Sequence, residues 1–154
     1  MNKILIVYYS RTGTTKKIAE DIKNRINCDI EEINSIQNRF GARGYLLCGK
    51  EATLKKPAEI KPTVKNPADY DLVIIGTPVW LWNISSPIRA YLKQNINRFR
   101  KIACFCTMGG SGAKRAFKEI EKICKIKSIA NFTVLTKDAS NCEKSLEEFI
   151  KKIF

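Results

Sequence analysis

Apolar runs and amphipathic segments alternate along the whole chain, and this alternation limits the fold more than any other feature of the sequence. Residues 4–9 are all apolar or aromatic, which is typical of a strand that is covered on both faces of a sheet. In residues 14–26 the apolar positions instead recur every three or four residues, as on one face of a helix: Ile18, Ala19, Ile22 and Ile26. The beginning of the chain is therefore predicted to fold as strand, tight loop and helix.

The same order continues to the end of the sequence. Further strands are predicted at 28–33, 71–76, 102–106 and 129–135. Three helices are expected in the second half of the chain. One begins near Pro87, one includes Phe117, and one, which includes Leu146, is the last element. Strands that alternate with helices predict an α/β protein, a three-layer sandwich with a parallel sheet between two layers of helices. The long connection at 34–70 is predicted to hold a short helix at 45–54 and an ordered, proline-containing surface stretch.

Length and composition favour one globular domain, 1–154, because 154 residues suit a single core. No apolar run approaches the roughly 18 residues of a membrane span, and residues 4–9 are too few for the core of a signal peptide. A cytoplasmic protein without membrane insertion is expected. The six cysteines form no CxxC pair and there is no histidine, so reduced thiols, mostly in the core, are predicted and no metal site is expected.

The formal net charge of +13 is the most unusual global property of the sequence. Lysines are scattered along the whole length, which is typical of a general solvated coat. An acidic protein partner is the second interpretation of the charge, and nucleic acid is the third. We expect no specific nucleic-acid binding.

A hydroxyl-rich segment, SRTGTT at 10–15, follows the first predicted strand. The carboxyl ends of parallel strands form the ligand-binding edge of such a sheet, and a helix N-terminus there favours an anion. The hydroxyls of Ser10, Thr12, Thr14 and Thr15 add donors, and Gly13 allows a tight turn. Helix capping is the simpler explanation, but one cap needs one hydroxyl. A bound phosphate is therefore predicted.

Other phosphate-binding loops do not fit this segment. An NTPase loop ends in GK[ST], whereas Gly13 is followed by TTKK, and the GxGxxG of a dinucleotide site is absent. A receiver domain requires acidic residues where the chain has Ser10 and Thr77, and a C-x5-R phosphatase loop requires an arginine where it has Gly110 and Gly112. A phosphate monoester remains the expected occupant.

Two more segments are predicted to lie at the same edge. The segment 76–87, GTPVWLWNISSP, is predicted to be a loop. It holds both tryptophans, Trp80 and Trp82, which offer a flat apolar wall. The segment 106–112, CTMGGSG, offers exposed backbone N–H groups to the polar edge of a ring. A phosphate site, an aromatic wall and a glycine-rich loop together predict a site for flavin mononucleotide (FMN).

The sequence resembles the flavodoxin family along nearly its whole length, with SRTGTT similar to the T/S-x-T-G-x-T phosphate loop and GTPVW similar to the second flavin loop. The resemblance, closest to short-chain members, implies a five-stranded sheet of order 2-1-3-4-5, non-covalent FMN and electron transfer at low potential. The candidate cofactor-binding residues are Ser10, Arg11, Thr12, Gly13, Thr14, Thr15, Pro78, Val79, Trp80, Trp82, Asn83, Thr107, Met108, Gly109 and Gly110.

The chain departs from flavodoxin electron carriers in two ways. Its third loop offers only Met108 where carriers usually have an aromatic residue against the outer flavin face, and its net charge is basic where carriers are acidic. An open flavin face suits an FMN-dependent NAD(P)H or quinone oxidoreductase, which is the alternative to a carrier. Because none of the three loops contains a histidine or a carboxylate, no catalytic residue is predicted and the redox chemistry is assigned to the flavin.

The same charges bear on potential and partners. Arg11, Lys114 and Arg115 are expected to flank the flavin, and one positive charge at about 8 Å is worth about 2 kcal/mol at an effective dielectric constant of about 20. A potential above the family norm is predicted for the reduced flavin. Redox proteins, with acidic surfaces as one option, are the expected partners of a monomer or weak dimer.

Overall fold

A computed structural model describes residues 2–154, and its centre is a parallel β-sheet. The five parallel strands lie in the spatial order β2-β1-β3-β5-β6, which is the predicted order 2-1-3-4-5 once the short β4 is set aside. Their bounds are Ile4–Tyr8 (β1), Asp29–Glu32 (β2), Leu72–Trp80 (β3), Ile102–Met108 (β5) and Ser128–Leu135 (β6). The additional β4, Asn83–Ile84, pairs antiparallel with the end of β3. The predicted fold class is confirmed.

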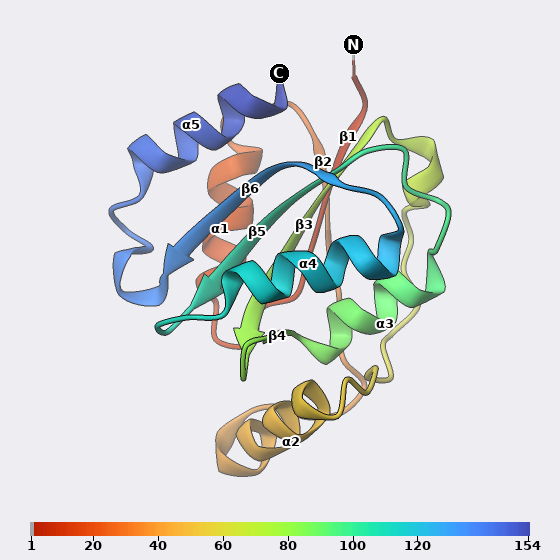
Figure 1. Ribbon diagram of the computed structural model, residues 1–154, viewed down its shortest axis with the longest axis vertical. Coiled ribbons are helices and arrows are strands. Elements are labelled where there is room, and N and C mark those ends of the chain that lie inside the picture. The colour runs from red at the N-terminus through yellow and green to blue at the C-terminus, as the bar shows by residue number, and fades with distance from the viewer. Residues whose placement is uncertain (1) are drawn as a thin grey trace.

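Helices cover both faces of the sheet (Figure 1). One apolar core joins alternate residues of β1, such as Leu5 and Val7, to the helices Ser86–Gln94 (α3) and Ala113–Cys124 (α4). The other core joins Ile4 and Ile6 to the helices Thr14–Lys23 (α1) and Glu143–Ile153 (α5). A strand that is buried on both faces explains why the first segment of the sequence is uninterruptedly apolar.

The helix Gly41–Thr53 (α2) belongs to neither layer. It lies beyond the carboxyl ends of the strands, next to the hairpin formed by β3 and β4 (Figure 1). Short 3-10 turns at Pro67–Asp69 and Thr136–Asp138 complete the secondary structure of the described residues. The predicted helix at 45–54 exists, but it begins four residues earlier, at Gly41. Its position makes α2 part of the edge at which ligands bind in such sheets.

The cysteines behave as the sequence predicted. All six are free, and five are buried. Cys104 and Cys106 point into the same apolar core from β5, where burial raises the pKa of both thiols well above the ordinary range. No helix within residues 2–154 is both long and apolar enough to cross a membrane.

A buried arginine ties α3 to α4. The guanidinium of Arg89 contacts the carboxylate of Glu119 at 2.7 Å and donates to Oδ1 of Asn83 at 3.2 Å. Burial acts to raise the pKa of Glu119, but the hydrogen bonds and charges of Arg89 and Lys55 outweigh it, so the net shift is downward. This ion pair therefore adds stability above the ordinary glutamate pKa, and that stability is lost as pH falls through the lower, folded-state value.

Glu119→Gln should therefore destabilise the protein at pH 7 by about 1–3 kcal/mol, the usual loss for a hydrogen bond to a charged group. The difference from the unsubstituted protein should shrink as pH falls below 4.5, where glutamate begins to bind a proton in the unfolded chain. Urea unfolding followed by circular dichroism at pH 7 and at pH 3 measures both values. Glu148→Gln, at an exposed position of α5, is the control and should change little at either pH.

Candidate functional site

The three predicted segments meet in one pocket at the carboxyl edge of the sheet, which we call the edge pocket. Its volume is about 120 Å³. It lies between the loop before α1, the end of β3 and the end of β5. Its lining residues are Arg11, Thr12, Thr14, Thr15, Pro78, Val79, Trp80, Thr107, Met108, Gly109 and Thr136. All but Thr136 belong to the candidate residues that the sequence supplied.

The N-terminus of α1 opens onto the edge pocket without a side-chain cap. Gly13 at the N-cap position has φ +100°, a conformation that favours glycine, and its N–H is bound by Oγ of Ser10 at 3.1 Å. Among residues 2–154, no side chain accepts from the N–H groups of the first turn, and that turn contains no acidic residue. These N–H groups, which have no partner within a helix, are available to an anion together with the hydroxyls of Thr12 and Thr14.

The floor of the edge pocket is fixed by a pair of buried hydroxyls. Oγ1 of Thr15 on α1 and Oγ1 of Thr107 on β5 are 2.7 Å apart, and the two side chains are 2% and 3% exposed. This bond joins the predicted first and third loops directly. The hydrogen bond between these two hydroxyls was not predicted from the sequence.

Thr15→Val should therefore cost about 1–3 kcal/mol of unfolding free energy, because it leaves the hydroxyl of Thr107 buried without its partner. The double variant Thr15→Val/Thr107→Val removes both hydroxyls and should recover part of that loss. Urea unfolding of the protein without added flavin measures the two values. A double variant that is less stable than the single one by the full cost of a second substitution would contradict this role for the pair.

The second predicted segment is a β-hairpin rather than a loop, so the expectation of a loop at 76–87 was wrong. Strand β3 continues to Trp80 because β5 remains paired with it as far as Pro78. Pro78 needs no ladder N–H toward β1, whose pairing ends at Gly76. Trp80 therefore stands on a strand, with its ring edge-on to Tyr9 at 5.5 Å and 5.9 Å from the guanidinium of Arg39.

The hairpin turn is made by two residues that rarely adopt its backbone conformation. Leu81 has φ +45° and Trp82 has φ +60°, values that suit the asparagine and glycine of common two-residue hairpin turns. Backbone held in the left-handed region by ordinary residues costs of the order of 1 kcal/mol or more each and is concentrated at functional sites. The turn exposes both apolar side chains, at 51% for Leu81 and 54% for Trp82.

Five of the candidate residues do not line the edge pocket: Ser10, Gly13, Trp82, Asn83 and Gly110. Nε1 of Trp82 donates to Oγ of Ser111 at 2.9 Å, and its backbone lies against Gly112, where a Cβ would come within 2.7 Å of it. Asn83 is buried, and its Oδ1 accepts from Arg89. Trp82 therefore joins the hairpin to the third loop, and Asn83 joins the hairpin to Arg89 of α3.

The third loop contributes Met108 and Gly109 to the edge pocket, whereas Gly110 lines a neighbouring hollow with Lys114. Thr136, which follows β6, was missed by the sequence analysis. Its hydroxyl donates to the carbonyl of Met108 at 3.2 Å and so holds the loop. A lone threonine after a strand carries no motif that would have identified it.

Arg11 is the charged residue of the edge pocket, and none of the described side chains that line the pocket is a carboxylate. Its Nε donates to the carbonyl of Arg39 at 2.8 Å and its Nη2 to that of Gly41 at 3.2 Å. The guanidinium also lies 5.7 Å from the ring centre of Tyr45. Arg11 therefore links the first loop to the start of α2. Lys114 and Arg115, which were expected to flank the same site, do not line the edge pocket.

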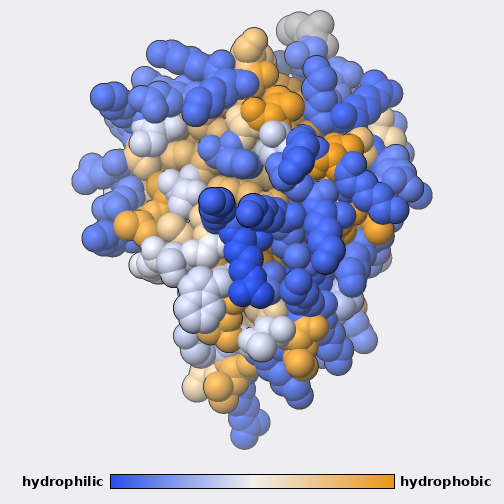
Figure 2. Space-filling view, viewed as in Figure 1, coloured by the Kyte–Doolittle hydropathy of each residue, from blue (hydrophilic) through white to orange (hydrophobic). Residues whose placement is uncertain are grey.

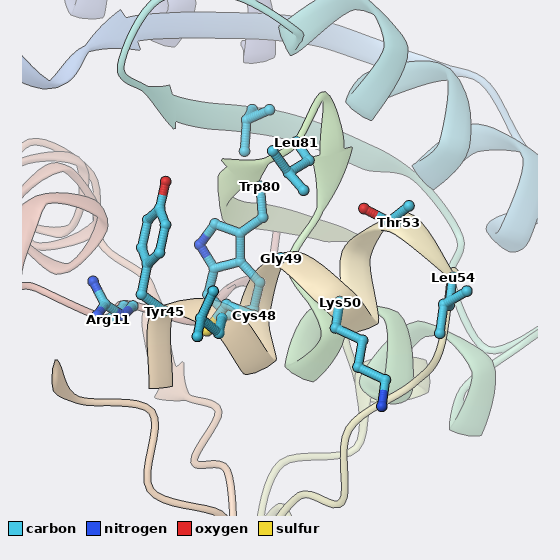
Figure 3. Close-up of a pocket in the computed structure, with 11 residues that line it drawn as sticks. Arg11, Tyr45, Cys48, Gly49, Lys50, Thr53, Leu54, Trp80 and Leu81 are labelled. Atoms are coloured by element: carbon cyan, nitrogen blue, oxygen red, sulfur yellow. The ribbon is translucent and has the colours of Figure 1, made fainter. Parts of the chain in front are cut away.

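A second, larger pocket of about 500 Å³ lies between α2 and the β3–β4 hairpin (Figure 3), and we call it the α2 pocket. It shares Arg11, Val79 and Trp80 with the edge pocket. The two pockets therefore meet at Trp80. The α2 pocket was not predicted from the sequence, although the predicted helix at 45–54 forms one of its walls.

Comparison with models of known protein families identifies the family of this chain. A family model described as flavodoxin matches residues 49–153. The chain belongs to the flavodoxin family. This match confirms the resemblance that the sequence motifs indicated. The matched range contains the hairpin and the third loop but not the phosphate-loop candidate at 10–15, which the sheet brings beside them.

This flavodoxin-family chain is also similar to solved and curated proteins. A flavoprotein of Lactobacillus acidophilus, crystallised in complex with FMN, is 27% identical, with a TM-score of 0.76 over 94% of this chain and 98% of that one. NAD(P)H dehydrogenase (quinone) 3 of Rhizobium meliloti is 31% identical over 101 residues, and an NAD(P)H dehydrogenase (quinone) of Cupriavidus metallidurans is 28% identical over 96 residues. Each match covers 61% of this chain but only 44% and 47% of those two relatives.

Proposed function

We propose that this flavodoxin-family protein binds FMN non-covalently at the carboxyl edge of the sheet, with its phosphate in the edge pocket, and serves as an electron-transfer flavoprotein. The observation that carries the proposal is the N-terminus of α1, which has no side-chain cap and opens into a pocket lined by hydroxyls and an arginine. That donor set fits a phosphate monoester. The FMN held by the Lactobacillus acidophilus relative, whose chain is covered almost completely, supports the same cofactor.

Each wall of the edge pocket then has a role toward the cofactor. The first-turn N–H groups of α1, with the hydroxyls of Thr12 and Thr14, hold the phosphate, and Arg11 balances its charge. Trp80 and Met108 offer apolar contacts to the flat ring, and the backbone of Gly109 and Gly110 can donate to its polar edge. Bound FMN would supply the reversible electron transfer.

Titration of the purified protein with FMN tests this function. We expect one FMN per chain, quenching of flavin fluorescence, and weaker binding of riboflavin, which lacks the phosphate. A protein that leaves flavin fluorescence unchanged at high concentration would reject the proposal.

An FMN-dependent NAD(P)H or quinone oxidoreductase is the second candidate. Two observations favour it: the third loop offers Met108 rather than an aromatic residue over the pocket, and the curated relatives bear the name NAD(P)H dehydrogenase (quinone). Stopped-flow mixing of the FMN-loaded protein with NADH or NADPH separates the candidates. Flavin bleaching within seconds, without an added reductase, supports the enzyme, and its absence supports the carrier.

The charge around the edge pocket predicts the direction of a potential shift. Arg11 lines the pocket and no carboxylate among its described lining residues opposes it, so reduced, anionic FMN should be favoured. We expect a less negative midpoint potential than an acidic flavodoxin gives under identical conditions. Potentiometric titration measures it, and a value as low as that of the acidic protein would reject the prediction.

The formal charge of +13 also suggests the partner. A redox protein with an acidic surface would be steered toward such a molecule, and electron transfer between the two should slow as salt is added.

A further inference from the structure

The α2 pocket adjoins the edge pocket at Trp80 and has the size that small organic ligands occupy. Its volume of about 500 Å³ exceeds the about 120 Å³ of the edge pocket. One wall is α2 and the other is the strained hairpin, whose Leu81 and Trp80 face the helix (Figure 3). Space-filling Figure 2 shows apolar surface at the end of the molecule that α2 forms, beneath a largely hydrophilic face.

The lining of the α2 pocket selects one kind of ligand. Most of its surface is aromatic or aliphatic, from Tyr45, Leu46, Leu54, Trp80 and Leu81. Its polar groups are hydrogen-bond donors, chiefly the side chains of Arg11 and Lys50, and no described lining residue is a carboxylate. The rings of Tyr45 and Trp80 therefore suit a flat apolar ligand, and the side chains of Arg11 and Lys50 suit oxygen acceptors on that ligand.

The pocket is preformed rather than a gap between loose elements. The start of α2 is held by the bonds from Arg11 to the carbonyls of Arg39 and Gly41. Its last turn is held by Glu51, which contacts Arg39 at 2.7 Å and also accepts from Ser86 of α3. The helix that forms this wall is therefore in place before a ligand binds, which lowers the cost of ordering the site.

Gly49 keeps the space open. A Cβ added at this position would lie 3.4 Å from Cδ1 of Leu81, on the opposite wall. The backbone of Gly49 is helical, so any larger residue fits the helix but extends into the pocket.

We propose that the α2 pocket is a second binding site, for a flat aromatic molecule that carries carbonyl or carboxylate oxygens. The rings lie between the apolar side of α2 and Trp80, and the oxygens point toward Arg11 and Lys50. This site does not depend on FMN for binding. The further statement that ligand and cofactor lie on either side of Trp80 rests on the proposed function.

A pair of ligands with one ring system and opposite charges tests the site. We use 2-naphthoate and 2-naphthylmethylammonium in isothermal titration calorimetry, with FMN-saturated and with FMN-free protein. We expect 2-naphthoate to bind with a Kd of about 0.1–1 mM, as its size permits. The cation should bind at least about tenfold more weakly, because it meets two positive side chains. Because Arg11 lines both pockets and also balances the FMN phosphate, FMN should raise the naphthoate Kd, but by less than about tenfold.

Matched variants locate the ligand. Gly49→Leu should abolish 2-naphthoate binding, whereas Gly49→Ala, which also stabilises the helix, should retain it. Lys50→Gln should weaken 2-naphthoate about threefold, and Lys56→Gln, which removes the same charge outside the pocket, should not. Circular dichroism verifies folding, and the Lys50→Gln result decides independently if Gly49→Leu does not fold.

Several results would overturn the proposal. The first is equal affinity for 2-naphthoate and 2-naphthylmethylammonium, and the second is unchanged 2-naphthoate binding by Gly49→Leu. The third is a naphthoate Kd raised more than about tenfold by FMN, which would place the ligand in the cofactor site. A dimer in sedimentation that Gly49→Leu disrupts would assign the face to a second copy of the chain. Failure of FMN to bind, with naphthoate binding intact, would reject only the proposed function.

Discussion

Replacing Thr14 by glutamate should lower FMN affinity by about 100-fold or more while leaving the fold intact. Thr14 is the first residue of α1 and lines the edge pocket. A carboxylate in the first turn of a helix stabilises that helix by about 0.3–1 kcal/mol, so the variant should fold at least as well as the original protein. Toward a bound phosphate the same carboxylate is repulsive, by about 3 kcal/mol for like charges about 5 Å apart at an effective dielectric constant of about 20. That energy corresponds to about 100-fold in affinity.

The glutamate result is interpreted against Thr14→Gln, which has nearly the same shape without the charge. Flavin fluorescence titration should show a loss for Thr14→Gln that is at least about tenfold smaller than for Thr14→Glu. Riboflavin should distinguish the two variants little, because it has no phosphate to repel. If FMN and riboflavin lose affinity equally in Thr14→Glu, the phosphate does not lie at the N-terminus of α1.

The central sheet could be predicted because its signal is local. Each face of β1 is buried, so Leu5 and Ile6 on opposite faces are both apolar, and the strand appears in the sequence as an unbroken apolar run. The phosphate loop at 10–15 could also be predicted from the sequence, since its hydroxyl residues directly follow the first strand. The edge pocket brings most of the candidate residues together because parallel strands end at one edge.

The hairpin and the α2 pocket could not be predicted because their causes are tertiary. Nothing in Leu81 or Trp82 indicates a two-residue turn, since neither is the asparagine or glycine that such a turn favours. The side chain of Asn83 is bound by Arg89, six residues later on α3, and this contact has no motif. The α2 pocket depends on how a helix from the long connection packs beneath the hairpin, which hydrophobic spacing alone does not specify.

The position of α2 depends in turn on a buried charge. The side chain of Arg39 is 2% exposed and that of Glu51 is 7% exposed, and their charged groups are 2.7 Å apart. Nε of Arg39 also donates to Oγ of Ser35 at 2.8 Å, and its guanidinium lies near the ring of Trp80. Arg39 therefore joins the long connection, α2 and the shared wall of the two pockets.

Arg39→Met should cost about 3–5 kcal/mol of unfolding free energy, because it leaves the carboxylate of Glu51 buried without its cation. Urea unfolding followed by circular dichroism at pH 7 measures this loss. Lys17→Met provides the contrast: it breaks the exposed pair with Asp21, whose charged groups are 2.6 Å apart, and should cost less than about 1 kcal/mol.

The double variant Arg39→Met/Glu51→Met separates the cost of an uncompensated charge from the loss of packing. Removing both charges replaces the buried pair by apolar groups of similar length, so it should be at least about 2 kcal/mol more stable than Arg39→Met alone. If the double variant is instead as unstable as the sum of the single variants, the shape of the arginine, rather than its charge, holds α2 beneath the hairpin. In that case Trp80 and the α2 pocket should be disturbed in both variants, and tryptophan fluorescence would report the change in each.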